Sequence, residues 1–127
     1  MPKFTMPEME KSFEVSVVGE ATGELYKGKF TYKKPNLGKI RQIRCTKAAL
    51  NEDFKNLDEE QLFMNEMLSW LSHTLLEHPT WWVNSGWDLY DYNVVVEIWS
   101  EVLIFEKSFK GKIEKQGEEV EKAPKKP

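Results

Sequence analysis

The feature that most constrains the fold is an alternation of apolar and polar side chains in two neighbouring segments. The apolar members are Phe13, Val15 and Val17 in the first segment and Tyr26, Phe30 and Tyr32 in the second. A two-residue period places these side chains on one face of a strand. The intervening segment contains Gly19 and Gly23, and glycine readily adopts turn conformations. The sequence therefore predicts an N-terminal β-hairpin.

Two helices are expected after the hairpin. Pro35 ends the second strand, because proline cannot donate to a strand ladder. Asn36 is the expected N-cap of a helix that extends to about Phe54. Its apolar stripe is Leu37, Ile40, Ile43, Leu50 and Phe54. Asp58, with Gln61 three residues later, resembles a capping box and starts a second, broadly apolar helix that Pro79 stops.

A third helix and a charged tail complete the predicted α+β chain. Asp91 or Asn93 is the expected cap of this helix. Its apolar face is Val95, Ile98, Val102, Phe105 and Phe109. From Gly111 onward the chain is almost all Lys, Glu, Gly and Pro, which favours disorder. We therefore expect an extended lead-in over 1–11, one hairpin-plus-helices domain over 12–110 and a flexible tail over 111–127.

Overall composition argues against several classes of partner. The 127 residues carry a formal net charge of -3, which gives no general attraction to nucleic acid or to an anionic membrane. No apolar stretch approaches the roughly 20 residues of a membrane span. The first residues lack the apolar core of a secretory signal, so we expect synthesis in the cytosol. The single cysteine, Cys45, cannot form an intramolecular disulfide.

No motif indicates catalysis. The two histidines, His73 and His78, are five positions apart, whereas metal-ligating pairs on a helix are four apart. Cys45 has Arg44 and Lys47 nearby, but no base is close in sequence. There is no phosphate-binding glycine loop and no nucleophile elbow. We therefore expect a protein that is not an enzyme and holds neither a metal nor a cofactor.

An aromatic cluster is the first candidate partner-binding site. It comprises Trp81, Trp82, Trp87, Tyr90 and Tyr92. One interpretation is an exposed anchor for a protein partner, since Trp and Tyr dominate binding hot spots. The other is a loop that folds back and covers the core. The sequence leaves both open.

A basic cluster is the candidate nucleic-acid contact. It comprises Lys39, Arg41, Arg44 and Lys47 in the first predicted helix. These residues are distributed around the helix, and a dedicated binder is usually more basic overall. Nucleic acid is therefore the weaker expectation, and a solvated helix surface the stronger one.

The order of several short segments resembles a known group of proteins. The segments are E-A-T-G-E-L-Y-K-G-K-F-T (Glu20 to Thr31), K-K-P-N-L (Lys33 to Leu37), H-P-T-W-W (His78 to Trp82), D-Y-N-V (Asp91 to Val94) and F-E-K-S-F (Phe105 to Phe109). Over residues 13–110 this order resembles small morphogenesis proteins of tailed bacteriophages, particularly tail assembly chaperones.

The resemblance implies a role in phage assembly. A tail assembly chaperone would bind tape measure or tail tube subunits in the host cytoplasm and keep them soluble. The alternative is a structural protein of the virion, either a capsid decoration protein or a head-tail connector subunit. A nucleic-acid-binding accessory protein is the third hypothesis. Whether the chain forms a homo-oligomer is left open, and no membrane partner is expected.

Overall fold

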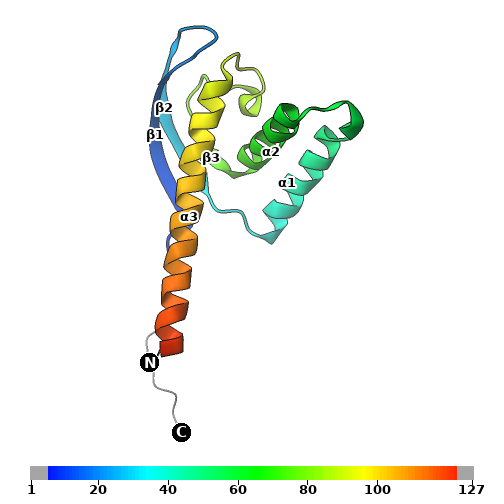
Figure 1. Cartoon of the computed structure of the whole chain (residues 1–127). Coiled ribbons are helices and arrows are strands. Elements are labelled where there is room, and N and C mark those ends of the chain that lie inside the picture. Colours follow the sequence, from blue (N-terminus) through cyan, green and yellow to red (C-terminus); the bar gives the residue numbers. More distant parts are fainter. Residues whose placement is uncertain (1–5, 123–127) are drawn as a thin grey trace.

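The computed structural model describes residues 6–122, with side chains described from 6 to 118, and has an α+β fold (Figure 1). The strands are β1 (Glu10–Val18), β2 (Leu25–Lys33) and β3 (Leu75–Glu77), and the helices are α1 (Leu37–Leu50), α2 (Glu59–Thr74) and α3 (Tyr92–Lys122). Short 3-10 turns lie at Phe54–Asn56 and Asn84–Gly86. The predicted hairpin followed by three helices is confirmed, and β3 is an addition.

The sheet is antiparallel, with the strand order β1-β2-β3. Phe13 pairs with Phe30 and Val15 pairs with Gly28, so the alternating apolar residues share one face. That face is covered, while the intervening residues of β1 are exposed. Apart from the buried Thr31 of β2, the sheet therefore buries one side, which is why its sequence alternates.

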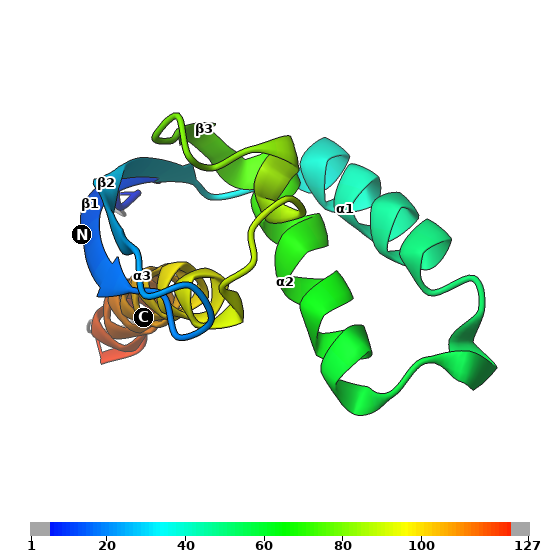
Figure 2. The same ribbon diagram turned by 90° about the horizontal axis from the view of Figure 1, so that it is seen from above.

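The core lies between the inner face of the sheet, α3 and α2. Phe30 and Tyr32 of β2 are fully buried there, together with Met67 of α2 and Ile98 of α3. Seen from above, α3 lies beside the hairpin, and α2 separates α1 from the sheet (Figure 2). Burial of this apolar surface is the main stabilising term of the fold.

We call α1, α2 and the turn between them the arm. Both predicted caps are present: the Asn36 side chain accepts from the Lys39 amide, and the Asp58 side chain from the Gln61 amide. Helix α1 ends at Leu50, before the predicted Phe54, and Ile43 is its only buried residue. The predicted apolar stripe of this helix is therefore largely not buried.

Polar contacts hold the arm together. The buried Asn65 side chain donates to Asn51 Oδ1 at 2.8 Å. Lys47 pairs with Glu66 at 2.7 Å, and the hydroxyl of Thr46 lies 2.8 Å from a ring nitrogen of His73. Half-exposed polar contacts contribute little individually, so α1 is anchored less firmly than the core elements.

The second and third helices end at different places from those predicted. Helix α2 stops at Thr74, not at Pro79, because Leu75 pairs with Tyr32 and extends the sheet. Helix α3 continues through Gly111 to Lys122, although residues 111–118 are mostly exposed. Lysine, glutamate and glutamine favour helix, which explains this continuation into the predicted tail.

Parts of the predicted lead-in and tail cannot be compared with the structure. Residues 1–5 of the lead-in and 123–127 of the tail are outside the described residues. The last two lead-in residues, 10 and 11, belong to β1.

Candidate functional site

The tryptophan loop after β3 folds back over the sheet. Trp81 donates its ring N–H to the Lys27 carbonyl at 3.0 Å. Its ring lies edge-on to Tyr26, with centroids 5.1 Å apart, and Trp82 packs in the same manner on Phe30 at 5.6 Å. Gly28 gives the loop room, because a Cβ there would lie 2.2 Å from Pro79 Cγ. The loop is therefore a lid on the core.

The predicted aromatic cluster is divided by this packing. Trp82 is only 3% exposed, so of the two interpretations its position matches the loop that covers the core. Trp81, Trp87 and Tyr92 are half-buried around the lid. Tyr90 alone is exposed, at 83%. Trp87, Tyr90 and Tyr92 line one small hollow of about 120 Å³, whereas Trp81 and Trp82 pack on the sheet.

Asp91 joins the start of α3 to the hairpin loop. Its buried carboxylate accepts from the amides of Ala21 and Thr22 at 2.7 and 3.0 Å, and from the hydroxyls of Thr22 and Tyr26 at 2.6 and 2.7 Å. Burial alone raises the pKa of Asp91, but the hydrogen bonds from Thr22, Tyr26 and Ala21 outweigh it and lower the pKa to about 2. Asp91 therefore directs its side chain to the loop rather than to the predicted helix cap.

A second polar network crosses three elements. Tyr32 on β2 donates its hydroxyl to Glu106 on α3 at 2.7 Å and accepts from the Trp70 ring N–H on α2 at 2.9 Å. Glu106 also pairs with Lys34 at 2.5 Å, and the Lys34 ammonium lies 4.7 Å from the Phe109 ring centroid. Burial and the bond to Glu106 raise the pKa of Tyr32 above its ordinary value. This network ties the middle of α3 to the sheet.

The predicted basic cluster does not form one stripe. Lys39 lies beside Pro35 and His73, whereas Arg41 and Arg44 line a separate shallow hollow. Lys47 is engaged by Glu66. The arrangement does not concentrate positive charge along one line, so it adds no support for the nucleic-acid hypothesis.

The side chains considered for metal or thiol chemistry are separated. Cys45 is exposed on α1. His73 contacts Thr46, and His78 lies next to the Pro79 carbonyl. Among the described residues, no group of three or more His, Cys, Asp or Glu side chains is placed to hold a metal ion. Within the same residues, no helix is both long enough and apolar enough to span a membrane.

The arm presents unpaired apolar side chains. Leu37 at the start of α1 is 86% exposed, and Phe54 in the turn is 64% exposed. Phe63 on α2 is also exposed. Exposed large apolar side chains supply contact area for protein partners.

A second apolar surface, which we call the α3 groove, lies along the C-terminal half of α3. Its volume is about 700 Å³, and its lining includes Lys34, Leu103, Glu106, Phe109, Lys110 and Ile113. The sequence does not reveal this groove, because Lys34, which directly follows β2, is distant in sequence from α3. Ile113, four residues beyond Phe109, is its local signal in the sequence.

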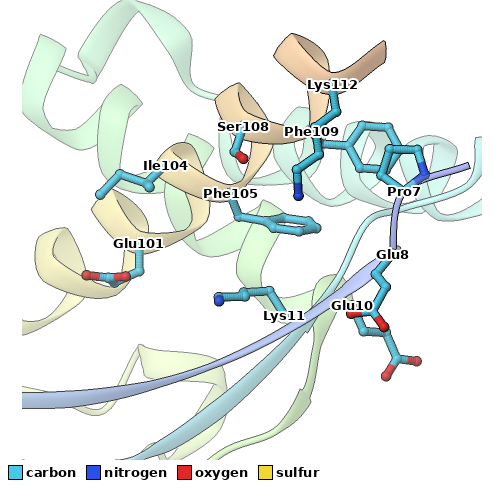
Figure 3. A pocket seen from close by; sticks show the side chains of 10 residues that line it. All are labelled: Pro7, Glu8, Glu10, Lys11, Glu101, Ile104, Phe105, Ser108, Phe109 and Lys112. Carbon is cyan, nitrogen blue, oxygen red and sulfur yellow. The ribbon is translucent and has the colours of Figure 1, made fainter. Parts of the chain in front are cut away.

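A hollow on the opposite flank of α3 has a different character. It measures about 420 Å³ and lies between α3 and the segment that leads into β1 (Figure 3). The Phe105 ring projects from α3 into it, above Lys11. Glu8, Glu101 and Lys112 give its walls charges of both signs. This hollow is less suited to an apolar partner than the α3 groove.

Comparisons with protein-family models, with curated proteins and with solved structures gave no match.

Proposed function

We propose that this chain is a non-enzymatic bacteriophage assembly protein, specifically a tail assembly chaperone that binds tape measure or tail tube subunits. The observation that carries the proposal is the exposure of three large apolar side chains on the arm, Leu37, Phe54 and Phe63. A chaperone of this kind covers apolar segments of its client until assembly, and such residues supply the contact area. The order of sequence segments supports the same role.

The construction of the arm suits transient binding. Its helices are joined largely by polar pairs, such as Asn65 with Asn51, and Ile43 is the only buried residue of α1. Elements with little apolar anchorage adjust at low free-energy cost. Helix α1 can therefore adapt to a client while the sheet, α2, α3 and the lid stay fixed.

The test is co-expression with a tape measure or tail tube subunit, followed by measurement of the soluble client. The wild-type chain is expected to raise the soluble fraction and to co-purify with the client. Phe54→Ser should weaken both effects. Leu25→Ser is the matched control, because Leu25 is 63% exposed against 64% for Phe54 but lies on the hairpin. Equal loss in both variants would contradict a role for the arm.

Purified virions distinguish the main alternative. A chaperone is expected to be absent from mature particles. A stoichiometric band of this chain in virions would contradict the chaperone and favour a decoration or connector subunit.

A further inference from the structure

One face of α3 carries three large apolar side chains, Trp99, Leu103 and Ile113, within a row of residues spaced by four and three. Trp99, Leu103, Glu106, Lys110, Ile113 and Gly117 recur in steps of four and three. We call this row the seam. Steps of four and three keep side chains in line along a partner helix. Leu103 is 49% exposed, and the seam from Leu103 to Ile113 lines the α3 groove.

When two copies of α3 run antiparallel, the seam of one copy is complementary to the seam of the other. It is symmetric about position 108: Leu103 mirrors Ile113, Glu106 mirrors Lys110, and Trp99 mirrors Gly117. In an antiparallel pair, Leu103 therefore faces Ile113, and Lys110 lies opposite Glu106, whose carboxylate is also contacted by Tyr32 and Lys34 of its own chain. A parallel pair would place Glu106 against Glu106 and Lys110 against Lys110, and like charges disfavour it.

We propose that the α3 groove binds the α3 helix of a second copy of this chain, in an antiparallel two-fold pair centred near position 108. Leu103 and Ile113 of each copy contact Ile113 and Leu103 of the other. Gly117 leaves room for the indole of Trp99, whose ring packs edge-on against Trp70 at 6.5 Å in its own chain.

The proposal also accounts for the length of α3. The helix continues to Lys122, and the side chains around Glu114 and Lys115 are exposed. A helix end without packing is marginally stable in water. In the antiparallel pair, the far half of each α3 lies along the near half of the other, over about 27 Å from residue 99 to residue 117.

Sedimentation equilibrium of the full chain tests the pairing. The expected mass is twice 14.9 kDa for the wild type. Leu103→Asp should raise the dimer dissociation constant about tenfold or more, because it places a charge against the apolar Ile113 of the other copy. Ile104→Asp is the matched control, since Ile104 is 63% exposed on the opposite flank of the same helix. Circular dichroism checks that both variants are folded.

Disulfide trapping tests the direction. In a Cys45→Ser background, a mixture of Leu103→Cys and Ile113→Cys chains should form a crosslinked pair. A sample of Leu103→Cys chains alone should not form a crosslinked pair. In the antiparallel arrangement, position 103 of one copy lies about 15 Å along the helix axis from position 103 of the other. Crosslinking of Leu103→Cys with itself would overturn the antiparallel arrangement.

Other outcomes also overturn the proposal. A wild-type chain that stays monomeric at millimolar concentration would contradict the proposed dimer. A dimer that Leu103→Asp leaves intact would assign pairing to another surface. A monomer whose Leu103→Asp variant loses a co-purifying client would make the α3 groove a client site instead.

Discussion

The Tyr26 hydroxyl donates to Asp91 Oδ2 at 2.7 Å, which joins β2 to the residue that precedes α3. The same carboxylate receives two amides and a hydroxyl from the hairpin loop. Bonds to a charged acceptor are stronger than neutral ones. The hydrogen bond to Asp91 also raises the pKa of Tyr26. Asp91 is therefore the point where the hairpin and the last helix are joined.

Acid should weaken the fold through Asp91. The folded-state pKa is about 2, below the ordinary 3.8, so the unfolded chain takes up the proton first as acid is added. The contribution of this carboxylate to stability is complete above pH 3.8 and is lost as the pH falls through about 2. Asp91→Asn should melt at a lower temperature at neutral pH and lose less stability on acidification. Thermal melts between about pH 5 and pH 2 measure this difference. A parallel pH dependence in variant and wild type would contradict it.

Gly19 should not tolerate a side chain. A Cβ at this position would lie 2.3 Å from the carboxyl carbon of Asp91, so Gly19→Ala must displace the carboxylate or the loop. The expected loss is about 1–3 kcal/mol in the free energy of unfolding, measured by urea denaturation. Gly111→Ala is the control: it lies in α3, has open space around it and should stabilise the helix by about 0.5–1 kcal/mol.

The lid tryptophan should be essential for stability. Trp82→Ala removes a buried indole that packs on Phe30 and should cost about 3–5 kcal/mol in the free energy of unfolding. Tyr90→Ala, in the same loop but exposed, should change it by less than about 0.5 kcal/mol. Calorimetric melting of both variants measures the contrast. Comparable melting temperatures for the two would show that the lid is not part of the core.

The Tyr32 hydroxyl should contribute to the free energy of unfolding, although its removal leaves no void. Tyr32→Phe leaves the Trp70 ring N–H without its acceptor and removes a donor from Glu106. The expected cost is about 1–3 kcal/mol in the free energy of unfolding. Urea denaturation measures it, with Tyr90→Phe as the control for loss of an exposed hydroxyl. Equal midpoints for the two variants would contradict a stabilising network.

Local patterns predicted the parts of the fold that depend on local physics. The alternation around Phe30 identified the hairpin, and Asn36 and Asp58 were recognised as helix caps because capping involves residues only three positions away. Strand β3 was missed because Leu75 leaves the helix to pair with Tyr32, which is distant in sequence. Asp91 has good capping chemistry, so nothing local indicates that its side chain binds Thr22 instead.

The candidate sites were harder to predict for the same reason. Trp81 and Trp82 are adjacent and chemically identical, and only the position of the sheet beneath them decides that Trp82 is the one fully buried. The α3 groove depends on Lys34 at the end of β2 lying beside Glu106. Its heptad spacing is nevertheless visible in the sequence once the helix is known to continue past Gly111.

The junction at Asp91 has a consequence for the order in which the chain folds during synthesis. Ala21 and Thr22 leave the ribosome 70 and 69 residues before the carboxylate that binds their amides. Contacts between such distant residues form slowly, because a long loop must close first. The hairpin is therefore synthesised first, but its contact with Asp91 forms last. Until α3 emerges, Phe30 and its neighbours are uncovered on the nascent chain, which is when aggregation competes with folding.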